Sequence, residues 1–183
     1  MRQRYLIALG SNQRHHRHGL PEGVLAAALA ALEAEGIAVE AAAPVIRSAP
    51  IGPSLRRYAN GAALVASDLW PDQLLAALKG IERRFGRRAG GQRWGSRVLD
   101  LDIVLWSGGA WSSPGLTVPH AAFRTRDFVL GPAAALAPRW RDPLSGLSLR
   151  QLKARLTRRA RIPKRAGRQG PLAQSVEQLT FNQ

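Results

Sequence analysis

Apolar positions in the first 105 residues recur with two different periods, which separate helix-like from strand-like segments. The clearest helix is predicted over 71–85, because Leu74, Leu78 and Ile81 recur at helical spacing and Gly86 follows as a stop. The same criteria predict a second helix over 21–35, with proline in its first turn. Short apolar runs bounded by turn residues predict strands over 5–9, 37–48, 58–67 and 98–105.

These segments follow the order strand, helix, strand, strand, helix, strand. That βαββαβ order is typical of a ferredoxin-like sandwich, which belongs to the α+β class. Pro44 indicates a bulge or an edge position within 37–48. C-terminal additions follow: a turn at Pro119–His120, an apolar segment over 128–136 and a helix near 148–156.

Two carboxylates interrupt the apolar run of the last of these strands. Because successive strand side chains point to opposite faces, Asp100 and Asp102 share one face, roughly 6.6 Å apart. The opposite face collects Leu99, Leu101 and Ile103. Like charges this close repel each other unless something positive lies between them. The alternative is an edge strand with a solvated polar face.

Arginines just before this strand favour a ligand site over a solvated face. Arg93 and Arg97 bring cationic groups next to the aspartates, and arginine suits phosphate because its planar fork donates two hydrogen bonds. Mg²⁺ usually takes one or two carboxylates together with water and substrate phosphates. The local pattern therefore predicts divalent cations held by carboxylates, with arginines holding phosphates.

Composition restricts the class of protein further. The 183 residues suffice for one domain with a real core, and the absence of cysteine excludes disulfides and thiolate metal sites. No apolar stretch approaches the ~20 residues of a membrane span, and we expect a cytoplasmic protein without a membrane partner.

The net charge is +15, but nine Lys and Arg and one acid lie beyond residue 149, so residues 1–149 carry about +7. We expect the basic tail to be a solvated extension rather than a nucleic-acid binder.

Several short segments together resemble the 6-hydroxymethyl-7,8-dihydropterin pyrophosphokinase family. The most specific is the Arg-Trp-Gly-x-Arg-x-x-Asp-x-Asp block, which begins at Arg93. The others occur in the family's order within residues 5–156: ALGSN at 8–12, YAN at 58–60, IE at 81–82 with GR at 86–87, LTVPH at 116–120 and RDFVL at 126–130. The resemblance implies the ferredoxin-like fold and transfer of pyrophosphate from ATP to the pterin hydroxymethyl group, with release of AMP. It also implies two Mg²⁺ ions on Asp100 and Asp102, which would screen the triphosphate.

The resemblance further assigns candidate site residues, and we expect the chain to act on ATP and the pterin as a monomer. Catalytic candidates are Arg87, Arg97, Asp100 and Asp102. ATP-binding candidates are Glu82, Arg87, Arg93, Arg97, Ile103, Thr117, His120 and Arg126. Pterin-binding candidates are Gly52, Tyr58, Asn60, Trp94 and Phe128. For Glu82, an exposed helical carboxylate is the alternative.

The chain also departs from the family pattern. The second predicted lid, 87–95, has Ala89-Gly90-Gly91 where a further basic residue is usual, and Ala121 follows His120 in place of an aromatic residue. The first predicted lid is 50–57. Three histidines at 15, 16 and 18 fall in a loop, where we do not expect a metal site.

The predicted domain is 1–159, followed by a basic, disordered tail over 160–183. The segment 170–183 back-translates to the start of a transfer-RNA gene, which suggests that the reading frame extends into an adjacent lysine tRNA gene; the coding DNA would test this. Two other functions fit parts of the pattern. An RNA-binding module also has βαββαβ order and a basic surface, and a catalytically silent relative would keep the fold without the intact aspartate pair.

Overall fold

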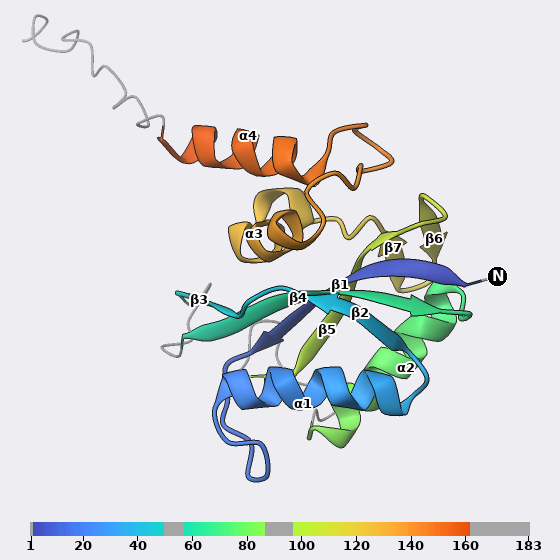
Figure 1. Cartoon of the computed structure of the whole chain (residues 1–183), viewed down its shortest axis with the longest axis vertical. Coiled ribbons are helices and arrows are strands. Elements are labelled where there is room, and N and C mark those ends of the chain that lie inside the picture. Colours follow the sequence, from blue (N-terminus) through green and yellow to red (C-terminus); the bar gives the residue numbers. More distant parts are fainter. Residues whose placement is uncertain (1, 50–56, 87–96, 162–183) are drawn as a thin grey trace, which may run out of the picture.

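The computed structural model describes residues 2–49, 57–86 and 97–161, and places one antiparallel sheet between two helical layers (Figure 1). The sheet contains β1 (Gln3–Ser11), β2 (Ala38–Ala42), β3 (Ile46–Ser48), β4 (Tyr58–Ser67) and β5 (Asp100–Trp106). Its order is β2-β4-β1-β5, and β3 pairs with β4 beyond the end of β2. This topology confirms the predicted ferredoxin-like sandwich.

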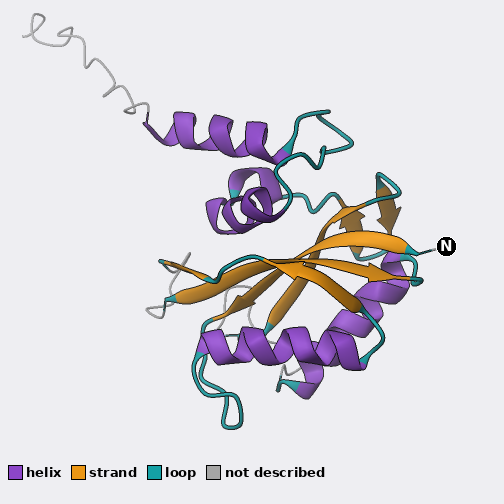
Figure 2. Ribbon diagram, in the orientation of Figure 1, coloured by secondary structure: helices purple, strands orange, loops and turns teal. Residues whose placement is uncertain are grey.

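One helical layer comprises α1 (Pro21–Ala34) and α2 (Pro71–Arg84), and the other comprises α3 (Asp127–Leu136) and α4 (Leu149–Arg161), as Figure 2 shows. The helix predicted near 148–156 is thus longer than expected. A short hairpin of β6 (Trp111–Ser113) and β7 (Leu116–Val118) and a 3-10 turn, η1 (Phe123–Thr125), connect β5 to α3. The sequence pattern did not predict this hairpin.

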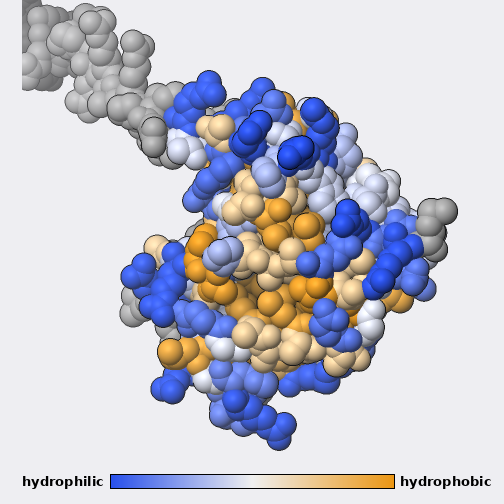
Figure 3. Space-filling model, in the orientation of Figure 1, coloured by the Kyte–Doolittle hydropathy of each residue, from blue (hydrophilic) through white to orange (hydrophobic). Residues whose placement is uncertain are grey.

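The segment predicted as a single strand over 37–48 forms two strands instead. β2 and β3 pair with successive parts of β4, and residues 43–45, which include Pro44, separate them. Proline has no N–H to donate to a strand ladder, which accounts for the break. Exposed alanines of β2 line this edge of the sheet, and Figure 3 shows an apolar band on the same side of the molecule.

Alternation along the strands produces two cores. Toward α1 and α2, the buried side chains include Ile7, Leu101 and Ile103. Toward α3 and α4, Leu6 packs with residues such as Leu130 and Leu152. Since α3 and α4 cover the second face only in part, the remaining part of this face is where the strands display polar side chains.

A bulge interrupts the pairing of β1 with β5. Leu6 pairs with Leu105 and Ile7 pairs with Ile103, so Val104 is an extra residue on β5. Val104 and Leu105 consequently both join the core beneath α3 and α4.

Candidate active site

Asp100 and Asp102 lie on β5, the edge strand, with their side chains on the face that α3 and α4 partly cover. Gly10 of β1 pairs with Asp100 on one side and with Asn60 of β4 on the other. A Cβ atom added to Gly10 would lie 3.8 Å from the Asn60 Oδ1 and 3.9 Å from the Asp100 Cβ. The three positions therefore share one face of the sheet. Ala8, opposite Asp102, continues this floor of small residues.

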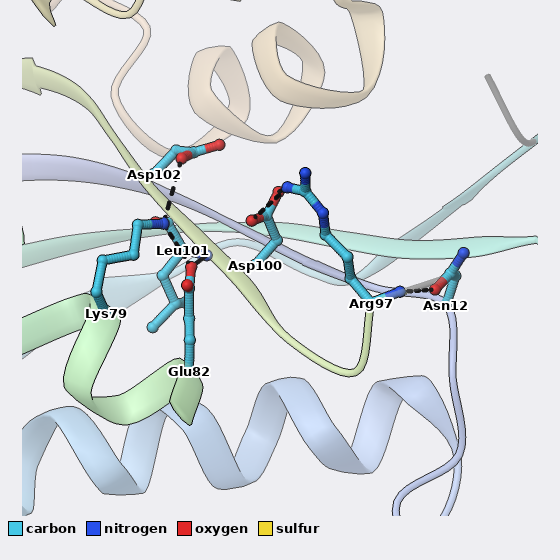
Figure 4. A network of polar contacts seen from close by, with 7 residues as sticks. All are labelled: Asn12, Lys79, Glu82, Arg97, Asp100, Leu101 and Asp102. Carbon is cyan, nitrogen blue, oxygen red and sulfur yellow. Dashed lines mark hydrogen bonds and ion pairs between the residues drawn. The ribbon is translucent and has the colours of Figure 1, made fainter. Parts of the chain in front are cut away.

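Arg97 forms an ion pair with Asp100, because its Nη1 lies 2.8 Å from both carboxylate oxygens (Figure 4). The Asn12 side chain fixes the backbone of this arginine: the Arg97 N–H donates to Asn12 Oδ1 at 2.7 Å, and the Asn12 N–H donates to the Arg97 carbonyl at 3.1 Å. The end of β1 is thereby attached to the segment that leads into β5.

Glu82 of α2 is fully buried, so the alternative of an exposed helical carboxylate is wrong. Its Oε1 accepts a hydrogen bond of 2.7 Å from the Leu101 backbone N–H. The Lys79 Nζ lies 2.7 Å from the same Oε1, 3.1 Å from the Leu101 carbonyl oxygen and 3.9 Å from Asp102 Oδ1 (Figure 4). Two side chains of α2 thus bond the backbone groups of β5 at its outer edge, between the two aspartates.

Three of the residues assigned to the pterin, Asn60, Tyr58 and Phe128, lie on other elements than β5. Asn60 is 4% exposed, and its Nδ2 donates to Ser48 Oγ at 2.9 Å. Tyr58 begins β4 two residues earlier and is half-buried. Phe128, near the start of α3, packs against the core beneath that helix, with the Arg126 guanidinium 6.0 Å from its ring centroid.

Three other ATP candidates lie at different positions around β5. The His120 backbone N–H donates to the Val104 carbonyl at 3.1 Å, which places His120 beside the strand just beyond Asp102. Thr117 is exposed on β7. The Ile103 side chain is 2% exposed and packs in the core toward α1 and α2, so only its backbone is available to a ligand on the aspartate face.

Four predicted site residues lie outside the described residues: Gly52, Arg87, Arg93 and Trp94. The predicted lid over 87–95 and residues 162–183 of the predicted tail also lie outside them, as does 50–56 of the other lid.

Sequence reasoning missed three residues that the structure places at the site. Lys79 precedes Glu82 by three positions, a helical spacing that signals a pair on one face. Asn12 and Gly10 belong to the ALGSN segment, which carries part of the resemblance, but neither residue was assigned a role. Their importance depends on which strands flank β1, and this the local pattern does not contain.

The donor set suits magnesium rather than a metal held by many protein ligands. Within residues 2–49, 57–86 and 97–161, no group of three or more His, Asp or Glu side chains could hold a metal ion. Two carboxylates on an accessible face, with an arginine beside them, nevertheless fit an ion that takes one or two carboxylates and completes its shell with water and phosphate oxygens.

A cleft lies away from the aspartates. Its volume is about 530 Å³, and it lies where the start of β1 meets the C-terminal end of α3, lined by residues that include Arg4, Leu64, Leu136 and Trp140. Its lining residues include no carboxylate. No helix in the described part of the chain is long and apolar enough to cross a membrane.

The sequence profile of the 7,8-dihydro-6-hydroxymethylpterin-pyrophosphokinase (HPPK) family matches residues 6–138. The chain belongs to the HPPK family. It is 41% identical over 145 residues to the 2-amino-4-hydroxy-6-hydroxymethyldihydropteridine pyrophosphokinase of Pseudomonas aeruginosa, covering 78% of this chain and 86% of that protein. It is 37% identical over 147 residues to the pyrophosphokinase of the same name from Synechocystis, covering 80% and 73%. Membership in the HPPK family decides against the RNA-binding alternative.

Solved structures support the HPPK fold independently of sequence. The Plasmodium falciparum HPPK-DHPS protein crystallised with pteroate superposes with a TM-score of 0.66 over 87% of this chain, at 11% sequence identity. The chain spans 43% of that protein's length. The fold of an HPPK is therefore retained even where few residues are shared.

Proposed function

We propose that Asp100 and Asp102 hold two Mg²⁺ ions in an HPPK active site on the sheet face that α3 and α4 only partly cover. The chain is a pyrophosphokinase of folate synthesis: it transfers pyrophosphate from ATP to the hydroxymethyl group of 6-hydroxymethyl-7,8-dihydropterin and releases AMP. The observation that supports the location is the row Asp100, Gly10 and Asn60, which brings a carboxylate and an amide to one small-residue floor.

Positioning and charge neutralisation are what this transfer requires of the protein, since little covalent chemistry involves its side chains. When bound, Mg²⁺ neutralises the triphosphate and stabilises charge on the oxygens of the transferred group. Arg97 is within hydrogen-bonding distance of Asp100, and its guanidinium is suited to donate to a phosphate oxygen instead. We assign the same task to Arg87, Arg93 and Arg126.

The pterin is assigned to the β4 side of this floor. The Asn60 amide can both donate and accept at the edge of a heterocycle, and its hydrogen bond to Ser48 holds it in place. We assign the two faces of the ring to Tyr58 and Phe128, and the loop contacts to Gly52 and Trp94.

His120 and Thr117 are assigned to the ATP side, together with the backbone of Ile103. Glu82 acts on this side through β5, because the Leu101 N–H and Lys79 already engage its carboxylate. We further propose a cytoplasmic monomer.

An AMP-release assay with ATP, Mg²⁺ and the hydroxymethyl pterin tests the function. We expect AMP formation to fall about a hundredfold or more in Asp100→Asn and Asp102→Asn, with far-UV circular dichroism unchanged. Glu40→Gln, which removes an exposed carboxylate from β2, is the matched control and retains activity. Full activity in both aspartate variants would contradict the metal assignment, and absence of AMP from folded parent protein would contradict the function.

A further inference from the structure

Lys79 is a cation beside the aspartate pair that the proposed transfer does not use. Its side chain is 33% exposed, and its Nζ lies 3.9 Å from Asp102 Oδ1, on the opposite side of the pair from Arg97. Each aspartate therefore has its own cationic neighbour: Asp100 has Arg97 and Asp102 has Lys79.

The two cations differ in how they are held. Arg97 precedes β5, and its guanidinium contacts Asp100 directly. The Lys79 ammonium instead is held at 2.7 Å by the fully buried Glu82 carboxylate and at 3.1 Å by the Leu101 carbonyl. These contacts with α2 and β5 hold the Lys79 ammonium near Asp102.

We propose that Lys79 is a positioning residue that acts as a built-in counter-ion of Asp102 and weakens the binding of a divalent cation there in the absence of nucleotide. The inference rests on the proposed metal role of Asp102. An ammonium fixed near a carboxylate repels a divalent cation bound to that carboxylate, by simple Coulomb interaction. Retention of the metal then depends on the negative charge that a triphosphate brings.

A counter-ion role and a purely structural role of Lys79 predict different changes in metal affinity when Lys79 is replaced. If Lys79 only held β5 against α2, its loss would loosen Asp102 and weaken metal binding, or leave it unchanged. If Lys79 is a counter-ion, its loss removes repulsion and strengthens metal binding, although the protein becomes less stable because Glu82 loses its ion pair.

The test is Mn²⁺ binding to the nucleotide-free full chain, measured by electron paramagnetic resonance of the free ion. We expect Lys79→Met to bind Mn²⁺ about threefold to tenfold more tightly than the parent, and Lys79→Arg, which keeps the charge, to bind within about twofold of it. Arg84→Met is the matched control: it removes one positive charge from the same helix, where Arg84 pairs with the exposed Glu35, and should leave Mn²⁺ affinity within about twofold.

A double-mutant cycle separates this inference from the metal assignment itself. Asp102→Asn alone should weaken Mn²⁺ binding; unchanged binding would refute the assignment of the metal to Asp102. In the Asp102→Asn background, Lys79→Met should no longer tighten binding. Unchanged or weaker binding by Lys79→Met in the otherwise unaltered protein, with circular dichroism showing a folded chain, would overturn the counter-ion role.

Discussion

The buried Glu82 carboxylate on α2 accepts a hydrogen bond from the backbone N–H of Leu101, the residue between the two site aspartates. The Glu82 side chain thus accepts a backbone hydrogen bond at the outer edge of β5, where a neighbouring strand would otherwise accept it. It also links the position of the aspartate pair to the packing of α2.

Substitution of Glu82 should therefore affect both stability and activity. Glu82→Ala removes the buried acceptor of the Leu101 N–H, and we expect a loss of about 2 kcal/mol in the free energy of unfolding together with reduced AMP formation. Glu82→Gln keeps an oxygen at this position and should lose less. Glu35→Ala, which breaks an exposed pair with Arg84, should change stability by about 0.5 kcal/mol or less. Urea unfolding provides the measurement, and equal effects of Glu82→Ala and Glu35→Ala would refute the prediction.

Gly10 should tolerate a methyl group but not a larger side chain. An added Cβ meets only ordinary contacts, at 3.8 Å to Asn60 Oδ1 and 3.9 Å to Asp100 Cβ, so Gly10→Ala should fold with unchanged or slightly increased stability. Gly10→Val places two more carbons between the Asn60 and Asp100 side chains, and we expect the KM for the pterin to rise about tenfold or more.

The control for Gly10→Val is Gly61→Val. Gly61 lies on β4, and a Cβ added there would point to the other face of the sheet, 3.8 Å from Leu25 Cδ1 of α1. Gly61→Val should lower stability by overpacking the core without raising the KM for the pterin. If Gly10→Val kept the parent KM, the floor of small residues would not be part of the pterin site.

Asp142 should contribute stability that is lost in acid. Burial alone would raise the pKa of this carboxyl, but hydrogen bonds from Arg124, Ser145 and the Leu144 N–H outweigh it and hold the pKa below the ordinary 3.8. The unfolded chain then binds the proton more readily, so the contribution is complete above pH 3.8 and disappears as the pH falls below it.

Urea unfolding between pH 2 and pH 7 measures this dependence. We expect Asp142→Asn to be about 2 kcal/mol less stable than the parent at pH 7 and to lose less stability on acidification. Glu40→Gln, which breaks an exposed ion pair with Arg4, should follow the parent curve. An Asp142→Asn curve parallel to the parent curve below pH 4 would contradict the assignment.

His15, in the first loop, should have a pKa below the ordinary value for histidine. Its ring lies 4.3 Å from that of His16 and 4.6 Å from that of His18, centroid to centroid. Desolvation and then the charges of His16, His18 and Arg17 lower the His15 pKa from 6.5. Since the unfolded chain accepts this proton first, stability decreases as the pH falls through 6.5 toward the lowered value.

Nuclear magnetic resonance of the imidazole Cε1 protons tests this directly. In His16→Gln and His18→Gln, the His15 pKa should move part of the way back toward 6.5, because desolvation is the larger cause and remains. A His15 pKa at or above 6.5 in the parent protein would be the contrary result.

Strand alternation made the aspartate face predictable from sequence, because period 2 is a property of the extended backbone itself. The positions of Leu101 and Ile103 in the opposite core confirm it. The burial of Glu82 was not predictable in the same way. It depends on α2 packing beside the edge of β5, and a helical pattern specifies its apolar face but not its partner strand.

The remaining differences between the predicted and the observed strands concern short elements. The hairpin of β6 and β7 has only three residues in each strand, too few for a recognisable alternation. The split of 37–48 into two strands was signalled by Pro44, but proline alone does not distinguish a bulge from a break. The pairing of both pieces with β4 is a tertiary property.

The extra residue in β5 has a consequence for how this enzyme can vary. Removal of Val104 would leave Leu6 opposite Leu105 and Ile7 opposite Ile103, so both aspartates would keep their face and their register. What would be lost is the carbonyl that receives the His120 N–H. The distance from the aspartates to the His120 segment is thus adjustable by a one-residue insertion or deletion, without rebuilding the sheet that carries them.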